Sequence, residues 1–480
     1  MAWGSGGFKS CDSLLARVEN NDPLLTELVI LPMKTFGEME LKRLSDILST
    51  GKNTHLTSIS ASGHAVPPET LYKLSQALAS PGGKNIKCLA IGDEQMGDEG
   101  VEALCRGMAH VNGGFLESLD LSSKNLTSVS MTYLARTFGK SQYLKSLHLY
   151  RNSICDEGLA NFKQEVMRNG RIESFPPLEL LDLSECNIGA VGVASLASCL
   201  SNEAYVHDSA MELILNNNPN IGSDGCRSLK HLISTPKCSS IIRKLSIRKC
   251  KIGDEGIIHL GSAFEMRSCK RLCSLDLVDN NIGPTGMEKF ATALMDHKMH
   301  IEDLNHLNLA ENALGSEGVF SLGRSLKSKE NEVGNHSIHT IDLSQTNCCP
   351  ESAAGLLKCN SLKSLRLFNN NLREGLEILV EYLHGGHSTL AHLDVAGNRA
   401  SGTTISSLLK AILVKTDPDN SVLHTLELGG NEINEDALEI IQKLEIVRPG
   451  LDIARDRPST SENNINLANE SNPTYDSNNQ

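Results

Sequence analysis

Apolar residues recur along this chain in one short phrase, in which leucine or a similar side chain occupies alternate positions. The stretch 275–286 reads LDLVDNNIGPTG, the stretch 307–318 reads LNLAENALGSEG, and the stretch 245–256 reads LSIRKCKIGDEG. Side chains alternate between the two faces of a β-strand, so the LxL core predicts a short strand with one buried face. Because the phrase recurs, we expect the same strand to recur as well.

The phrase defines 14 repeat units, which follow one another at intervals of 24 to 34 residues. Each unit has apolar anchors at the first, fourth and sixth positions of its phrase. The central anchors are Leu28, Ile59, Leu89, Leu119, Leu147, Leu181, Leu213, Leu245, Leu275, Leu307, Ile341, Leu365, Leu393 and Leu426. A period of this length is typical of solenoid proteins, in which stacked units share one core.

One position in the turn after the strand is often asparagine, whose amide can bond backbone groups that would otherwise be buried without partners. The asparagines are Asn152, Asn218, Asn280, Asn312, Asn370, Asn398 and Asn431. Other residue types fill the same position elsewhere: His64, Glu94, Lys124, Cys186, Cys250 and Thr346. The predicted asparagine ladder is therefore irregular, most of all near the N-terminus.

The pattern after each turn changes to apolar residues at i, i+3 and i+7, as within 193–200 and 287–294. This spacing predicts a short amphipathic helix. An aspartate precedes several of these helices, and we expect it to cap the N–H groups of its own helix; the residues are Asp98, Asp156, Asp224 and Asp254. Glycines such as Gly192 and Gly286 stand in the first turn, where we expect a side chain to collide with the neighbouring repeat.

Each unit is thus expected to contain one strand, one turn and one helix. Strands stack about 4.8 Å apart and helices roughly 8–10 Å apart, so the stack must curve with the sheet inside. We predict an α/β solenoid of horseshoe shape, with a parallel β-sheet on its concave face and helices on its convex face. Residues 1–23 are expected to form an N-terminal capping segment, 24–457 the repeat domain with a C-terminal cap, and 458–480 a disordered Asn/Ser-rich tail.

These phrases resemble the leucine-rich repeat family, specifically the ribonuclease-inhibitor-like subclass with full helices. The resemblance covers roughly residues 24 to 445. The units with DEG and GPTG are also similar to the repeats of the Ran GTPase-activating protein and of NOD-like receptors. The chain departs from the Ran activator in its repeat number and its tail, and no catalytic residue of that family can be assigned to a position here. A Walker-type GxxxxGK[ST] motif is absent from the sequence.

Composition limits the classes of function. The formal net charge is −13, which argues against general binding to nucleic acid or anionic membranes. The first residues, MAWGSGGFKS, contain no apolar signal core, so we expect a cytoplasmic or nuclear location and reduced cysteines. We find no catalytic motif, and the HxxH pairs His297/His300, His336/His339 and His384/His387 have no recurring acidic or cysteine third ligand beside them. We therefore expect no enzymatic activity, no metal and no cofactor.

The candidate binding residues lie at variable strand and turn positions, because these face the concave surface while the anchors are buried. One row of such positions is mostly acidic: Asp120, His148, Asp182, Ile214, Ser246, Asp276, Asn308, Asp342, Arg366, Asp394 and Glu427. Aromatic and arginine side chains are typical anchors of interfaces, which singles out His148, Tyr150, Arg151, Arg366 and Phe368. The alternative is that the acidic row is only solvated and that the aromatic rings contact nothing beyond their neighbours.

A second candidate is the basic stretch 242–252, which reads IRKLSIRKCKI, beside acidic residues of the following units. We name Arg243, Arg248 and Lys249 with Asp276, Asp279 and Glu311 as candidate partner contacts. Such a pattern can steer a charged partner. It can equally be neutralised within the chain by exposed ion pairs of little energetic value.

Two functions are compatible with these observations. The first is a non-enzymatic scaffold, expected to be monomeric, that binds a protein partner through its concave face and one rim. The alternative, which rests on the resemblance alone, is a GTPase-activating protein that acts on a Ran-like small GTPase. The sequence does not distinguish the two.

Overall fold

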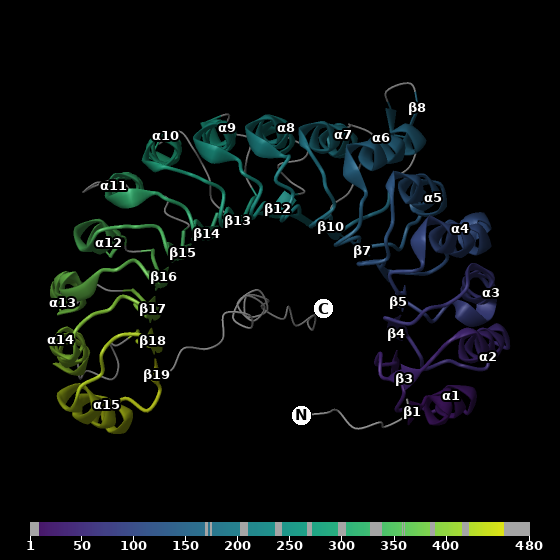
Figure 1. Ribbon diagram of the computed structural model, residues 1–480, viewed down its shortest axis with the longest axis horizontal. Helices are drawn as coiled ribbons and strands as arrows, with labels where there is room; N and C mark the ends of the chain where they lie inside the picture. The colour runs from purple at the N-terminus through teal and green to yellow at the C-terminus, as the bar shows by residue number, and fades with distance from the viewer. Residues whose placement is uncertain are drawn as a thin grey trace, which may run out of the picture. The chain divides into compact units, whose positions relative to one another are not determined.

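A computed structural model describes residues 9–168, 171–172, 175–201, 210–235, 242–265, 271–295, 304–326, 338–357, 359, 361–384, 389–414 and 422–455. These residues belong to two compact units, 1–338 and 339–480, and each is a repeat solenoid. In both units the strands line the inner side and the helices the outer side, and Figure 1 follows them from purple to yellow along the chain. The predicted tail at 458–480 lies outside the described residues.

The first unit has a parallel sheet whose strands follow the order of the chain. Its strands are β2 (Glu27–Val29), β4 (Ser58–Ser62), β5 (Cys88–Gly92), β6 (Ser118–Asp120), β7 (Ser146–His148), β10 (Leu180–Asp182), β11 (Met211–Ile214), β12 (Ile242–Ser246), β13 (Ser274–Asp276) and β14 (His306–Asn308). Two short pairs lie outside this sheet: β1 (Lys9–Ser10) with β3 (Lys34–Thr35), and β8 (Met167–Arg168) with β9 (Arg171–Ile172).

Helices follow the strands of the first unit as the apolar spacing predicts. They are α2 (Glu38–Ser49), α3 (Pro68–Ala79), α4 (Gly97–Met108), α5 (Ser128–Phe138), α6 (Cys155–Val166), α7 (Ala190–Leu200), α8 (Gly222–Ser234), α9 (Gly253–Glu265), α10 (Pro284–Met295) and α11 (Gly315–Ser325). Before them, α1 (Asp12–Glu19) buries Leu15 and Val18, and the capping role of this segment stays a prediction.

The second unit repeats the arrangement with strands β15 (Thr340–Asp342), β16 (Ser364–Arg366), β17 (His392–Asp394), β18 (Thr425–Glu427) and β19 (Asp452–Ala454). Its helices are α12 (Pro350–Leu356), α13 (Glu377–His384), α14 (Gly402–Val414) and α15 (Glu435–Val447). The sequence phrase did not identify β19, which pairs with β18 and places Ile453 beside Leu426. Among the described residues, no helix has the length and apolar character needed to cross a membrane.

The central anchors lie in register from strand to strand. Leu181 pairs with Leu147 on one side and with Leu213 on the other, and in the second unit Leu365 pairs with Ile341 and Leu393. All of these side chains are buried. The pairing fixes which residues of each strand face the core and which face the inner surface.

The asparagine ladder is present. The amide of Asn312 accepts hydrogen bonds from the N–H groups of Asn280 and Ile282 and donates to the carbonyls of Leu277 and Leu309. The thiols of Cys186 and Cys250 replace the amide in their units, donating to the carbonyls of Leu149 at 3.1 Å and Leu215 at 3.2 Å. Lys124 is also buried at this position.

The predicted role of the aspartates before the helices is wrong in one respect. Asp98 and Asp156 lie inside the first turn of α4 and α6, and neither helix has a side-chain cap. Instead, the carboxylate of Asp98 accepts the N–H of Thr127, and that of Asp156 accepts the N–H of Gly189 at 2.6 Å. Each aspartate therefore satisfies the start of the next helix in the stack rather than its own, while its charge still complements the helix dipole.

Candidate inner-face binding site

The inner face of the first unit presents the variable strand residues in parallel rows. Pairing places Asp120 beside His148, His148 beside Asp182, and Asp182 beside Ile214. The row continues from Ser246 to Asp276 in β12 and β13. The predicted inward-facing row is thus continuous in space, and its members are free to differ because the anchors alone fill the core.

A second row lies at the turns, three residues after each of these positions. Its members have positive φ angles from 52° to 58°: Arg151, Glu185, Asn217, Lys249, Asp279 and Glu311. The N–H groups of the first five bond to the adjacent unit, as Lys249 does to the carbonyl of Val278 at 2.9 Å. We name these six residues the turn row. Left-handed backbone costs non-glycine residues about 1 kcal/mol or more, so these bonds help to hold the backbone of the turns in this conformation.

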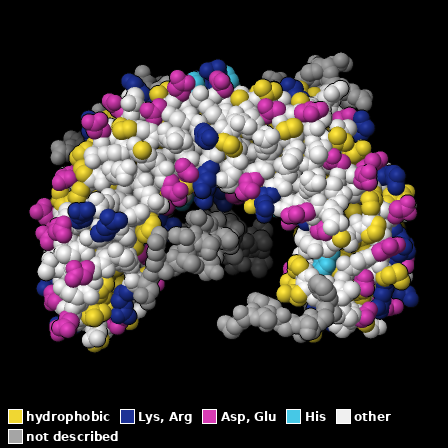
Figure 2. Space-filling model, viewed as in Figure 1, with side chains coloured by type: hydrophobic (Ala, Val, Ile, Leu, Met, Phe, Trp, Pro, Cys, Tyr) yellow, Lys and Arg dark blue, Asp and Glu magenta, His cyan; other side chains and the backbone are white. Residues whose placement is uncertain are grey.

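The turn row contains charges of both signs. Arg151 Nε lies 3.6 Å from Glu185 Oε2, and Lys249 Nζ lies 4.0 Å from Asp279 Oδ2. These side chains are between 40% and 54% exposed, so water screens the pairs and each contributes little to stability. Figure 2 shows basic and acidic side chains beside one another along the inner rim of the first unit rather than one basic patch.

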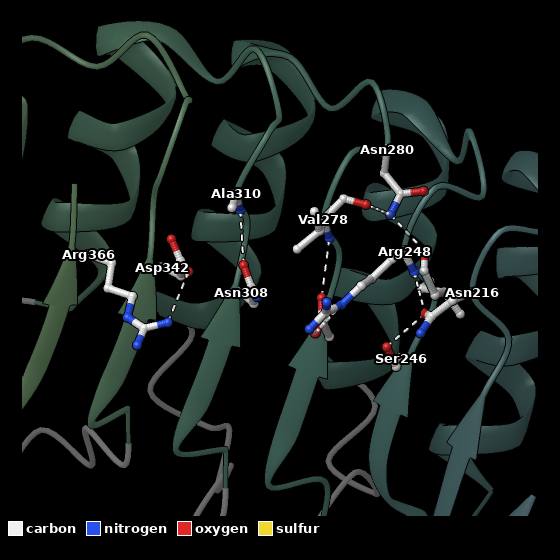
Figure 3. Close-up of polar contacts among 11 residues, drawn as sticks. Asn216, Ser246, Arg248, Val278, Asn280, Asn308, Ala310, Asp342 and Arg366 are labelled. Carbon is white, nitrogen blue, oxygen red and sulfur yellow. Dashed lines mark hydrogen bonds and ion pairs between the residues drawn. The ribbon is translucent and has the colours of Figure 1, made fainter. Parts of the chain in front are cut away.

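Arg248 is the most strongly held basic residue of the predicted basic stretch. Its Nε donates to Asp276 Oδ2 at 2.7 Å, and its Nη2 also lies close to that oxygen. Its backbone N–H donates to Asn216 Oδ1, which also accepts the hydroxyl of Ser246 at 2.8 Å (Figure 3). The Arg248 and Asp276 side chains are only 28% and 11% exposed. The charge of Arg248 is therefore neutralised by Asp276 within the chain. Arg248 thus has mainly a structural role in the site.

Arg243, the third basic residue named as a candidate contact, lies away from the turn row. It is half-buried near the start of β12, and its carbonyl accepts the N–H of Cys273 at 2.7 Å. The structure thus brings Lys249 together with Asp279 and Arg248 together with Asp276, but it places Arg243 at the opposite end of the strand.

The aromatic candidates are half-buried. The Arg151 guanidinium carbon lies 5.9 Å from the centre of the Tyr150 ring, and burial together with Glu185 raises the pKa of Tyr150. His148 Nε2 lies 2.9 Å from the hydroxyl of Ser146 on the same strand. Tyr150, Arg151 and Glu185 therefore form one small cluster beside the turn between β7 and α6.

The second unit contains Arg366 and Phe368. Arg366 Nη1 lies 4.0 Å from Asp342 Oδ2, and both side chains are about 15% exposed. Phe368 lies against Gly397 of the following repeat, where a Cβ atom would come within 2.8 Å of the ring. Gly397 has a φ of +70°, so glycine is required there for the backbone as well as for the ring.

Near Arg366 lie His392, Asp394 and Glu427. Sequence reasoning placed Asp394 and Glu427 in the acidic row without naming them as partner contacts, and it did not name His392. Burial and the neighbouring Glu427 raise the pKa of Asp394 to about 7. Burial also raises the pKa of Glu427, and burial with Arg366 lowers the pKa of His392 to about 4. The LDV and LEL phrases identified Asp394 and Glu427 as inward-facing. How close these side chains lie to each other and to His392 depends on strand register.

The described residues contain no group of three or more His, Cys, Asp or Glu placed to hold a metal ion. The cysteines that the structure describes are free thiols, most of them buried. What the inner face offers is therefore an array of fixed charged and aromatic side chains.

Comparison with known proteins agrees with this architecture. The sequence profile described as "Leucine Rich repeat" matches residues 176–197, 239–261, 269–291 and 300–323. The human protein "NACHT, LRR and PYD domains-containing protein 5" is 28% identical over 315 residues, which cover 60% of this chain and 25% of that protein. The chain thus spans about a quarter of the length of this relative.

Two ribonuclease inhibitors match over a larger part of the chain. The mouse inhibitor is 27% identical over 344 residues, covering 72% of this chain and 64% of the inhibitor. The pig inhibitor is 24% identical over 389 residues, covering 75% of this chain and 80% of the inhibitor. Together with the alternating strands and helices of both units, these matches show that the chain is a leucine-rich repeat protein of the ribonuclease-inhibitor-like type.

Proposed function

We propose that this protein is a non-enzymatic scaffold that binds a protein partner through the inner face of its first unit. The observation that carries this proposal is the turn row, in which charged side chains project from left-handed residues held by backbone bonds to the next repeat. A backbone that is already ordered loses less conformational entropy when a partner binds. The relatives with leucine-rich repeats, among them proteins named as inhibitors of ribonucleases, are compatible with a binding role.

Within this face, Arg151, Lys249 and Tyr150 are the proposed anchors. Arg151 and Lys249 are each 54% exposed, whereas Arg248 is tied to Asp276. A partner can therefore take over the weak, exposed pairs of Arg151 and Lys249 without breaking a buried one. Asp279 and Glu311 would bind basic groups of the same partner.

Charge reversal at the two exposed anchors tests the proposal. The inner variant carries Arg151→Glu and Lys249→Glu, and glutamate already occupies the same left-handed turn at Glu185 and Glu311, so folding is expected to be preserved. Reversal of Arg248 is avoided, because a carboxylate there would face Asp276 and destabilise the protein. We expect the inner variant to lose proteins that the wild-type chain retains in quantitative affinity purification.

The matched control carries Lys73→Glu and Lys289→Glu on the outer helices α3 and α10, with the same change in net charge. The outer variant is expected to retain the same proteins as the wild type, with an unchanged melting temperature for both variants. An identical set of retained proteins for wild type, inner variant and outer variant would contradict the proposed surface.

Activation of a small GTPase stays an alternative that the sequence resemblance alone suggests. Phosphate release from GTP-loaded Ran, measured with and without this protein, tests it. Faster phosphate release in the presence of this protein would favour the GTPase-activating function over the scaffold. An unchanged rate would exclude the GTPase-activating function toward Ran. The monomeric state and the cytoplasmic or nuclear location likewise stay predictions.

A further inference from the structure

Four ionisable side chains lie in one row across the inner face of the second unit. Strand pairing places Asp342 beside Arg366, Arg366 beside Asp394, and Asp394 beside Glu427. Neighbouring strands are about 4.8 Å apart, so each group is in direct electrostatic contact with the next. The row thus holds three carboxyl groups and a single guanidinium.

This row is poorly hydrated. The side chains of Arg366, Asp342 and Glu427 are 15% to 16% exposed, and Asp394 as a residue is 6% exposed. With every carboxyl ionised, the row would carry a charge of −3 + 1 = −2 in a site that solvates charge badly. Like charges on adjacent strands and burial both favour protonation of one carboxyl.

A neighbouring imidazole supplies an acceptor for that proton. His392 Nε2 is buried, makes no hydrogen bond to the residues that the structure describes, and lies 3.4 Å from Glu427 Oε1. Because burial and Arg366 lower the pKa of His392 to about 4, the ring is neutral at physiological pH and does not form an ion pair with Glu427. A protonated Glu427 can donate to Nε2 when the neutral ring carries its hydrogen on Nδ1, whereas the other neutral tautomer would donate its Nε2–H to an ionised Glu427.

The groups around Asp394 have opposing effects on its ionisation. Its Oδ1 accepts the N–H of Ala396 at 2.9 Å, which together with Arg366 favours the carboxylate. Burial, Glu427 and Asp342 favour the acid and outweigh them, so the pKa of Asp394 rises to about 7. The titratable and charged groups around Asp394 and Glu427 are Asp342 on β15, Arg366 on β16, His392 on β17 and Asp452 on β19.

We propose that Asp394 and Glu427 share one buried proton, which His392 Nε2 helps to hold, and that this proton is a pH-sensitive switch of the charge on the inner face of the second unit. The row carries −1 with the proton and −2 without it. As pH rises through neutrality, the face gains a negative charge and attracts cationic groups more strongly. Only this last consequence rests on the proposed binding function, because the proton itself belongs to the free chain.

The linkage between protonation and folding makes the switch measurable without a partner. A carboxyl whose pKa is raised by folding stabilises the folded state at low pH, and this contribution is lost as pH rises through the folded-state pKa. Glu427→Gln replaces the acid by an amide that donates to Nε2 at every pH. The urea midpoint of this variant, relative to wild type, is expected to increase from pH 5 to pH 8. Asp394→Asn is expected to behave in the same direction, and it serves as the second variant if the first folds poorly.

Asp276→Asn is the matched control, because Asp276 occupies the same row position in the first unit but is flanked by Ser246 and Asn308 instead of a second carboxyl. Its midpoint difference from wild type is expected to stay constant between pH 5 and pH 8. A second readout counts protons: at pH 6 the wild-type chain should release about one more proton on unfolding than Glu427→Gln does. Midpoint differences that do not depend on pH, with equal proton release, would overturn the proposal.

Discussion

The carboxylate of Asp254 in α9 accepts a hydrogen bond from the backbone N–H of Gly283 at 2.6 Å, across the boundary between two repeats. The same relationship joins Asp156 to Gly189. In both pairs an aspartate of one unit contacts a glycine of the next. A glycine suits this position because the carboxylate must come close to the backbone. Successive helices of the stack are thereby locked at their N-terminal ends.

Removal of this carboxylate is expected to weaken the stack. Asp254→Ala leaves the half-buried N–H of Gly283 without its partner, which should lower the free energy of unfolding by about 1 to 3 kcal/mol. Asp224→Ala is the matched control, because the Asp224 side chain is 72% exposed and pairs with Arg227 at 3.4 Å. Urea unfolding followed by circular dichroism measures both, and equal losses for the two variants would contradict this role of Asp254.

A methyl group at Gly286 should destabilise the protein, because it would collide with Asp254 of the preceding repeat. An added Cβ would lie 2.5 Å from Asp254 Oδ1 and 2.7 Å from its Cα, and backbone cannot move aside cheaply. Gly286→Ala is expected to cost about 1 to 3 kcal/mol. Gly355→Ala in α12 meets nothing within 4 Å and should stabilise by up to about 1 kcal/mol through helix propensity. Melting temperatures that shift in the same direction for both variants would count against the predicted collision.

The asparagine ladder predicts a larger effect. Asn312→Ala removes an acceptor shared by two buried N–H groups and a donor shared by carbonyls of two repeats. We expect a loss of about 3 kcal/mol or more. Asn220→Ala, which removes one exposed side-chain bond to Asn187, should change stability by less than about 0.5 kcal/mol. A small effect at Asn312 would show that water replaces the ladder.

Burial predicts which thiols react. The pKa values of Cys105, Cys186 and Cys250 are raised to about 12 by burial, so these thiols hold little reactive thiolate at pH 8. Cys155 and Cys349 are half-buried. Iodoacetamide should alkylate the first group at least about tenfold more slowly than the second, as measured by peptide mass spectrometry. In urea the difference should disappear, and its persistence would show that burial is not the cause.

Periodicity alone predicted the elements of the repeats and the buried side of each. The central anchors, the glycine collisions and the asparagine ladder are all confirmed, because each follows from positions within one phrase and its immediate neighbour. The sequence analysis missed strand β19 because the repeat phrase is incomplete there, and only Ile453 and its neighbours match it.

The errors concern partners that are remote in sequence. Asp98 was predicted to cap its own helix, whereas its acceptor atoms face Thr127 and Ser130 of the next unit. Likewise, the approach of His392 to Glu427 depends on the register of β17 and β18 and on side-chain direction, neither of which a single phrase determines. The basic stretch around Arg248 was identified, but its neutralisation by Asp276 required the geometry.

Carboxylate labelling of the protein alone and in complex with a purified partner tests the central claim most directly. A water-soluble carbodiimide with glycine ethyl ester modifies accessible carboxyl groups, and the turn row offers Glu185, Asp279 and Glu311, while α10 offers the exposed Glu288 on the outer side. We predict that the partner protects the three turn-row carboxyl groups and leaves Glu288 as reactive as before. Protection of Glu288 with unchanged labelling of the turn row would contradict binding at the inner face.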